Sequence, residues 1–220
     1  MADEHVRAAA FETAWARALA CTRCPALVAS RSQVVVGAGA AAAEVLIVGD
    51  APGAAEDAGG LPLAGRAARL LDRLLEEVGV APADVFATTL VKCRPPGNRD
   101  PSPGEVANCS EHLLAQVELV RPVVVVALGG FVTKLLRGDP APIRARRGRE
   151  EARTLGSHPF WLLPAFHPAA ALYAPALTEQ LRADLARLPE LVARGRPEAE
   201  APPAEPEPEV ATAPGQLELF

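Results

Sequence analysis

The run Arg121–Gly130, RPVVVVALGG, constrains the fold of this chain more than any other stretch. Its β-branched residues show no polar alternation, which is typical of a strand buried on both faces of a helix-covered parallel sheet. Similar short runs occur at 45–49, 84–91 and 161–165, and helical patterns stand around them at 4–20, 66–78, 103–120, 131–136 and 178–193. Strands that alternate with helices predict an α/β fold with right-handed crossovers.

Two of these helices also carry signals for where they begin or end. Gly79 follows the 66–78 pattern and is expected to end that helix. Ser102 precedes Pro103 and is expected to cap the helix over 103–120. The chain has 220 residues, half of them hydrophobic, so we expect one domain of ordinary size with a substantial core.

The stretch Val45–Asp57, VLIVGDAPGAAED, is where we first look for chemistry. An apolar run that ends in Gly and Pro indicates a buried strand entering a loop. In an open α/β sheet such loops lie at the carboxyl ends of the strands, where ligands bind. Asp50, Glu56 and Asp57 are therefore the first acidic candidates, although Asp50 fits the role of a helix cap equally well.

Four cysteines, Cys21, Cys24, Cys93 and Cys109, predict a metal or cluster site. The first two form a CxxC pair, and no secretory signal favours disulfides. On chemistry alone, four thiolates suit either zinc or an iron–sulfur cluster.

A proline-dense loop, KCRPPGNRDP, follows the strand at 84–91 and surrounds one of these cysteines. Such a loop cannot form regular structure, and Lys92, Arg94 and Arg99 give it a cationic surface. A second basic run comprises Arg144, Arg146, Arg147, Arg149 and Arg153. By itself, that second run is typical of a solvated face.

The net charge of −5 is concentrated in one part of the chain. Residues 196–220 hold one Arg and six Glu, so the remainder is neutral and a polyanionic partner is not disfavoured. No apolar stretch is long enough to span a membrane, and no basic segment precedes an apolar run near Met1. We expect a soluble cytoplasmic protein with no membrane partner.

The composition changes to Pro, Glu and Ala from residue 195, which predicts a disordered linker over 195–215 after a domain over 1–194. The last five residues are apolar again: Gln216, Leu217, Glu218, Leu219 and Phe220. A chance hydrophobic end is the alternative, but we favour a docking peptide over 216–220.

Five motifs, in order, resemble the family-4 uracil-DNA glycosylases, the iron–sulfur branch of the uracil-DNA glycosylase superfamily, over about 21–188. They are CTRC, GDAPGAAED, LPLAGRAARLLD, TTLVKCRPPGNRDPSPGEVANC and FHPAAAL. The resemblance implies a single three-layer α/β/α domain with a central, mainly parallel four-stranded sheet. It also implies a 4Fe-4S cluster held by Cys21, Cys24, Cys93 and Cys109.

The reaction that the resemblance implies is hydrolysis of the N-glycosidic bond of uracil, or a related deaminated base, in DNA after base flipping. Asp50, His167 and Glu56 are the implied catalytic residues, and His167 would donate a hydrogen bond to the base oxygen. The implied base-binding residues are Asp50, Ala51, Leu63, Thr89 and His167. The implied DNA contacts are Lys92, Arg94, Arg99 and Arg147.

Three pocket positions depart from the family pattern, which typically has Glu at Asp50, Phe at Leu63 and Asn at Thr89. Loss of the aromatic face costs roughly 1–3 kcal/mol of base stacking. Threonine replaces an amide, which has both a donor and an acceptor, with a short hydroxyl. Two alternatives therefore stay open: a DNA- and clamp-binding iron–sulfur protein with lost or altered excision, and a zinc-stabilised α/β protein of another function.

The terminal QLELF resembles the short peptides by which bacterial repair and replication proteins bind the sliding clamp. Gln216, Leu217, Leu219 and Phe220 would make the contacts. On a flexible linker this peptide would concentrate a monomeric enzyme near DNA without fixing its orientation.

Overall fold

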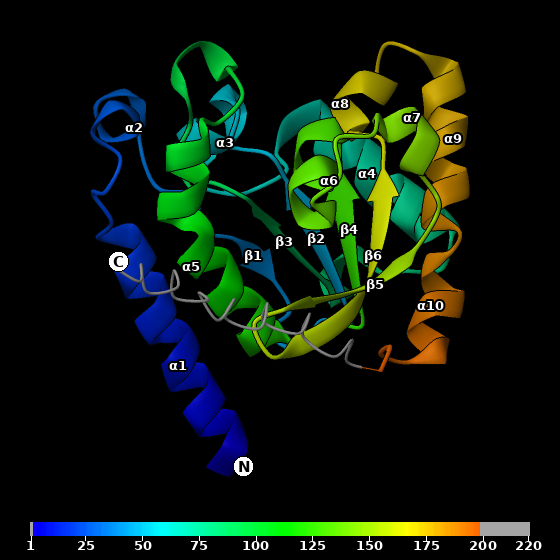
Figure 1. Ribbon diagram of the computed structural model, residues 1–220, viewed down its shortest axis with the longest axis horizontal. Coiled ribbons are helices and arrows are strands. Elements are labelled where there is room, and N and C mark those ends of the chain that lie inside the picture. The colour runs from blue at the N-terminus through cyan, green and yellow to red at the C-terminus, as the bar shows by residue number, and fades with distance from the viewer. Residues whose placement is uncertain (1, 199–220) are drawn as a thin grey trace, which may run out of the picture.

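The computed structural model describes residues 2–198 (Figure 1). Within them, six strands form one sheet: β1 (Ala38–Gly39), β2 (Val45–Gly49), β3 (Val85–Thr89), β4 (Val124–Leu128), β5 (Glu151–Leu155) and β6 (His158–Ala165). The helices are α1 (Ala2–Leu19), α2 (Pro25–Ser30), α3 (Ala54–Gly59), α4 (Gly65–Glu77), α5 (Pro103–Val120), α6 (Gly130–Arg137), α7 (Ile143–Arg146), α8 (Pro168–Ala171), α9 (Pro175–Leu185) and α10 (Leu188–Arg194), with 3-10 turns η1 (Pro82–Asp84) and η2 (Pro96–Asn98).

The strand order is β1-β3-β2-β4-β6-β5. The four inner strands are parallel and are the four predicted from the sequence, which confirms the α/β prediction. The two edge strands are antiparallel additions that the sequence did not predict. β1 has only two residues, and β5 carries the polar sequence EARTL, so neither has the apolar run of a buried strand.

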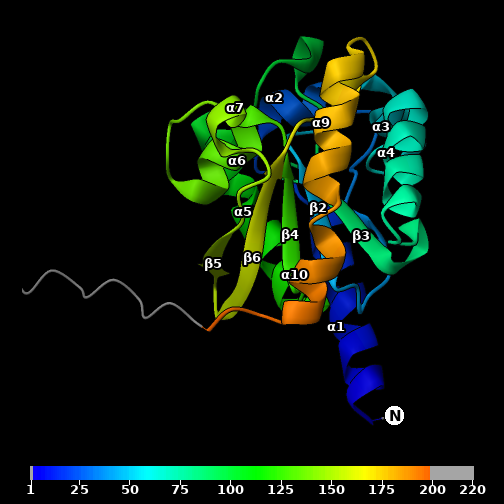
Figure 2. The ribbon, with the colours of Figure 1, turned by 90° about the vertical axis from the view of Figure 1, so that its right-hand side faces the viewer.

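Helices cover both faces of the sheet, as the edge-on view shows (Figure 2). One core lies under α4, α9 and α10 and includes Leu74, Leu181 and Leu188, each with no exposed surface. The opposite core lies under α5 and α6 and includes Phe86, Leu113 and Val132. β2 and β4 are buried along their whole length between the two cores, which is why their sequences are continuously apolar.

Helix ends follow the local sequence, with one correction. Ser102 caps α5 as predicted, because its side chain accepts from the Glu105 amide at 3.3 Å. The single helix predicted over 178–193 is wrong: the structure has α9 and α10, separated at Ala186 and Arg187. Pro189 lies in the first turn of α10, where its missing N–H is tolerated, so it starts the second helix rather than continuing the first.

The structure bears on the membrane expectation only for residues 2–198, and it does not describe the predicted docking peptide. Within residues 2–198, no helix combines the length and the apolar character needed to cross a membrane. The docking peptide at 216–220, and the predicted linker from residue 199 onward, lie outside the described residues.

Candidate active site

Polar side chains gather at the carboxyl edge of the parallel strands. Asp50 follows β2, Thr89 ends β3, Gly129 follows β4, and His167 lies two residues beyond β6. The chain order of the parallel strands reverses between β2 and β4, so the sheet has its switch point beside Asp50 and Gly129. Ligands bind at such a point in open α/β sheets.

The Asp50 carboxylate lies at the amino-terminal end of α6. Its Oδ1 accepts a hydrogen bond of 2.8 Å from the backbone N–H of Val132. Burial raises the pKa of Asp50 to about 6, against the opposing effect of the Val132 hydrogen bond. Asp50 does not cap the helix that follows β2, because α3 begins after Gly53. Its carboxylate instead binds the first turn of α6, which comes much later in the chain.

His167 presents a defined hydrogen-bond donor. Its Nδ1 accepts from the backbone N–H of Ala169 at 3.2 Å, at the start of α8. Burial lowers the pKa of His167, so the neutral imidazole predominates at neutral pH. Because Nδ1 is the acceptor, the proton of the neutral ring is assigned to Nε2, which is left to donate elsewhere.

Two glycines allow these side chains to meet. A Cβ atom built on Gly129 would lie 3.5 Å from Asp50 Oδ2 and 3.7 Å from His167 Cβ. A Cβ built on Gly49 would lie 3.5 Å from Thr89 Cγ2 and 4.0 Å from His167 Nε2. Gly129 also has a φ of +105°, a conformation that L side chains rarely adopt. Asp50, Thr89 and His167 therefore surround one small space, and the sequence reading did not identify Gly129 as part of it.

The remaining predicted base-pocket residues lie on neighbouring loops. Thr89 is 4% exposed, and its hydroxyl donates to the Val91 carbonyl at 2.7 Å, so the hydroxyl can only accept from a ligand. Leu63 is partly buried and has a φ of +52°, which costs a leucine roughly 1–2 kcal/mol. Ala51 follows Asp50 directly and is partly buried.

Glu56 ties together the loop that carries Leu63. Its Oε2 accepts from the Gly53 N–H at 3.1 Å, and its Oε1 accepts from the Ala64 N–H at 2.9 Å. Because its two oxygens bind the backbone N–H groups of Gly53 and Ala64, Glu56 holds these two parts of the loop together. Asp57, the third acidic candidate, is buried and accepts the Ser32 N–H with both oxygens, at 2.9 and 3.0 Å.

The four cysteines line one small cavity between α2, the loop after β3, and α5. Within residues 2–198, no group of three or more His, Cys, Asp or Glu side chains is spaced to hold a single metal ion.

Each of the four sulfurs accepts a hydrogen bond from a different N–H group. The Arg23 guanidinium donates to Cys21 at 3.4 Å, and the Asn108 amide donates to Cys24 at 3.5 Å. The Arg31 guanidinium donates to Cys93 at 2.9 Å, and the Lys92 backbone N–H donates to Cys109 at 3.3 Å. Donors of this kind stabilise thiolate charge, so this donor set fits a thiolate-bound metal group.

The pKa values of the cysteines reflect the balance between burial and these donors. Partial burial would raise the pKa of Cys21, but the hydrogen bonds from Arg23 outweigh it and the pKa is lowered. Burial raises the pKa of Cys93 and of Cys109.

Lys92 does not lie where the predicted DNA contact requires. The side chain is 1% exposed, and its Nζ donates to Thr88 Oγ1, the Thr89 carbonyl and Gln116 Oε1 at 2.5–2.7 Å. Burial lowers the pKa of Lys92 to about 7. The ammonium group therefore cannot reach a phosphate, and its three acceptors show an internal role beside the cysteine loop.

The other predicted DNA contacts are held by protein partners to different degrees. Arg99 makes a two-pronged contact with Glu105, at 2.8 and 2.7 Å. Arg147 pairs with Asp184 at 2.6 Å and lies over the Phe166 ring. Arg94 donates to Asn98 at 2.8 Å, and among the described residues it has no carboxylate partner.

The second basic run is largely paired rather than simply solvated. Arg146 bonds Asp139 at 2.5 Å, and Arg153, on β5, bonds Glu151 at 2.9 Å. These two pairs are local to their segments, and Glu151 also pairs with Arg137 at the end of α6, which links β5 to that helix.

Comparison of the sequence with known proteins identifies the class of protein that has this fold and these residues at the sheet edge. A family model described as the uracil DNA glycosylase superfamily matches residues 36–188. The chain is 35% identical over 183 residues to the type-4 uracil-DNA glycosylase of Archaeoglobus fulgidus, covering 81% of this chain and 92% of the relative. It is 42% identical over 153 residues to the type-4 enzyme of Thermotoga maritima, covering 69% and 78%. For the type-4 enzyme of Saccharolobus solfataricus the identity is 38% over 165 residues, covering 73% and 76%.

The chain therefore belongs to the uracil-DNA glycosylase superfamily, and within it to the type-4 family. This membership confirms the family predicted from the five sequence motifs. It assigns no role to an individual residue, so the roles proposed below depend on the geometry.

Proposed function

We propose that this protein is a DNA-repair glycosylase that hydrolyses the N-glycosidic bond of uracil in DNA. The observation that carries the proposal is the proximity of Asp50 and His167 at the sheet edge: the Asp50 carboxylate and the His167 side chain both adjoin Gly129, and His167 Nε2 lies beside Gly49. A flipped nucleotide would enter this crevice from the duplex or from a single strand.

The two side chains suit the charges that develop when the bond breaks. Departure of the base leaves positive charge on the sugar and negative charge on the base. Asp50, ionised above a pKa of about 6, would stabilise the sugar cation or orient the attacking water. His167 would donate its Nε2 proton in a hydrogen bond to the base oxygen, and as a neutral ring it needs no proton from solvent.

Base selection by this pocket would be weaker than with an amide at position 89. The Thr89 hydroxyl already donates to Val91, so it retains only an acceptor function for a base. Leu63 supplies an apolar but not an aromatic surface. We propose uracil as the principal base, with the excision rate reduced or related deaminated bases admitted.

A 4Fe-4S cluster bound by Cys21, Cys24, Cys93 and Cys109 is part of this proposal. The common cavity and the four sulfur hydrogen bonds support it. When bound, the cluster would supply a covalent cross-link between the segment before α2, the loop after β3, and α5. Arg23 and Arg31 would offset its negative charge.

For DNA contact we propose Arg94 first. Arg99 keeps 43% of its side chain exposed, but it would have to share its charge with Glu105.

We also propose that the protein acts as a monomer and that the peptide at 216–220 binds a bacterial sliding clamp. Deletion of 216–220 should abolish clamp binding and leave turnover on short oligonucleotides unchanged. Equal clamp affinity in the truncated protein would refute the docking role.

The proposed activity is tested with oligonucleotides containing uracil, hypoxanthine or xanthine, single- and double-stranded. Release of uracil leaves an abasic site that alkali cleaves. If none of the three bases is released, the excision proposal fails. The alternative, a DNA- and clamp-binding iron–sulfur protein of the same fold with lost or altered excision, rests on the departures from the family pattern at Asp50, Leu63 and Thr89. It predicts activity only after Leu63→Phe and Thr89→Asn are introduced.

A further inference from the structure

An apolar groove lies between α1 and the β1 edge of the sheet, away from the strand ends that carry Asp50 and His167. Its volume is about 770 Å³. Phe11 and Trp15 of α1 and Phe86 of β3 form its aromatic lining, with ring centroids 5.8–6.3 Å apart. Leu19, also in the lining, is 53% exposed. An apolar surface of this kind is typical of a site that another segment covers.

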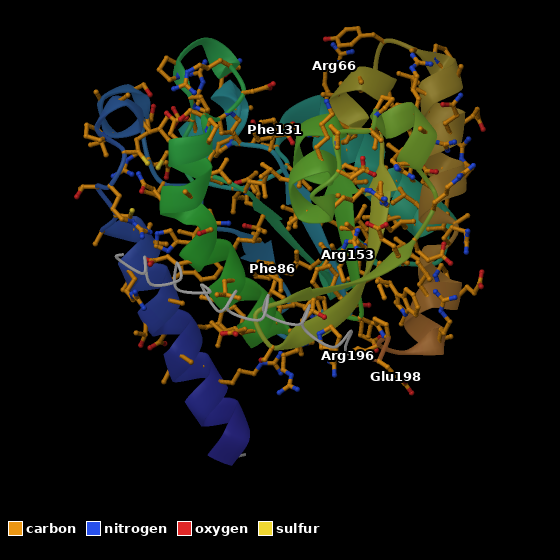
Figure 3. The ribbon with its side chains drawn as sticks, viewed as in Figure 1. Arg66, Phe86, Phe131, Arg153, Arg196 and Glu198 are labelled. Atoms are coloured by element: carbon orange, nitrogen blue, oxygen red, sulfur yellow. The ribbon has the colours of Figure 1, made fainter. Side chains whose placement is uncertain are left out.

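The groove and Arg196, near the end of the described residues, are both held at the carboxyl-terminal end of α5. Arg7, which lines the groove, donates to the carbonyls of Leu119 at 2.9 Å and Val120 at 3.0 Å. Arg196 donates to the carbonyl of the next residue, Arg121, at 2.6 Å. Figure 3 shows Arg196 and Glu198 at the end of the molecule opposite the arrowheads of β4 and β6.

The chain beyond residue 198 is long enough to reach the groove. Residues 199–220 can span up to ~70 Å when extended. A body of this size has a radius of gyration of about 16 Å. Residues 199–215 therefore suffice to bring 216–220 to any part of the groove from the anchor at Arg121.

The side chains of the last residues fit the groove in kind. Leu217, Leu219 and Phe220 are apolar, and the polar Glu218 separates the two leucines. Alternation of this type suits an extended peptide that lies along a sheet edge, and among residues 2–198 β1 pairs only with β3. In such a peptide Leu217 and Leu219 lie on one face, and they would pack against the rings of Phe11 and Trp15.

We infer that residues 216–220 dock in this α1 groove of their own chain. In the docked state the peptide is withheld from other proteins, so a partner that recognises QLELF must compete with the groove. The inference does not depend on glycosylase activity, because it concerns a surface away from the sheet edge that carries Asp50 and His167.

The test uses tryptophan fluorescence, because Trp15 lies in the groove and the only other tryptophan is Trp161. In a Trp161→Phe background, deletion of 216–220 should shift the Trp15 emission to longer wavelength. Adding a synthetic GQLELF peptide in trans should reverse the shift, and a GQAEAA peptide should not. If Trp161→Phe lowers stability, the indole ¹H–¹⁵N resonance of Trp15 in the otherwise unchanged chain gives the same readout.

A matched pair of variants on α1 locates the site. Ala16→Glu puts a carboxylate into the groove lining and should weaken peptide binding at least tenfold. Ala9→Glu adds the same charge at an exposed position of α1 outside the lining and should leave binding unchanged. Three results would overturn the inference: no response of Trp15 to the deletion, equal binding by the two variants, or a Trp15 signal in the full chain that depends on protein concentration, which would place the peptide on a second copy.

Discussion

At the scale of single residues, Asp50 links catalysis to pH. Burial raises its pKa to about 6, and the proposed chemistry requires the ionised form. The single-turnover excision rate should therefore fall about tenfold per pH unit below pH 6 and level off above pH 7. Because the pKa of His167 is lowered, its neutral form is available over the same plateau. A rate that stays constant between pH 5 and pH 7 would contradict the assignment of Asp50.

The ionised Asp50 carboxylate should lower the free energy of unfolding at neutral pH. Its folded-state pKa lies above the unfolded value of 3.8, so the folded state is favoured by protonation and loses stability as pH rises from about 4 to 6. Asp50→Asn should raise the free energy of unfolding by up to ~3 kcal/mol at pH 7.5 and by about half as much at pH 5. Urea unfolding at the two pH values checks this, and a gain that is larger at pH 5 would refute it.

Base readout is decided at Thr89 and Leu63. Thr89→Asn restores an amide donor and acceptor at the end of β3, and Leu63→Phe restores an aromatic face. Together they should increase uracil excision by at least tenfold relative to the parent chain, since each contact is worth about 1–3 kcal/mol. The measurement is kcat/KM for uracil and for hypoxanthine. A lower value for uracil in the double variant would show that the pocket is built around another base.

At the scale of elements, the link between β4 and α6 is the part of the site most sensitive to backbone change. Gly129→Ala puts an L side chain on a residue with a φ of +105°, which L residues rarely adopt, so the turn that joins β4 to α6 would have to shift beside Asp50. We expect at least a hundredfold loss of excision. Gly138→Ala is the matched control, because this glycine also has a positive φ, of +69°, but its Cβ would meet no atom within 4 Å. Equal losses in the two variants would assign the effect to backbone strain alone.

The sequence predicted elements better than it predicted contacts. The four parallel strands were predictable because each contains a mainly apolar run, whereas β1 and β5 are too short or too polar to show one. The cysteines and His167 were recognisable from motifs. The burial of Lys92 was not, because its partners Thr88 and Gln116 come from two other elements, β3 and α5, and only the packed structure brings them together.

The cysteine segment joins elements that are far apart in the chain. Arg31 donates to the buried Cys93 sulfur, so Arg31→Met removes one hydrogen bond and one positive charge from the proposed cluster. Its reduction potential should become more negative, since hydrogen bonds and positive charge stabilise the reduced state. Arg69→Met, at an exposed position on α4, is the control. An unchanged potential, or purified protein that contains zinc without iron and sulfide, would contradict this account of the site.

At the scale of the whole molecule, the proposed active site and the proposed docking groove lie toward opposite ends of the parallel strands. Asp50, Thr89 and His167 lie at the carboxyl ends of the parallel strands, whereas the α1 groove and the Arg196 anchor lie toward the amino ends. Base chemistry and partner docking can therefore be altered independently. Deletion of 216–220 should leave the excision rate on short oligonucleotides within twofold of the full chain.

The most direct test of the central claim compares two carboxylates in single-turnover uracil excision. Asp50 and His167 both adjoin Gly129 at the sheet edge, while both oxygens of Glu56 bind backbone amides. We predict that Asp50→Asn lowers the rate at least a hundredfold and that Glu56→Gln lowers it much less. An Asp50→Asn rate close to that of the unmodified protein, or a larger loss in Glu56→Gln, would contradict the account.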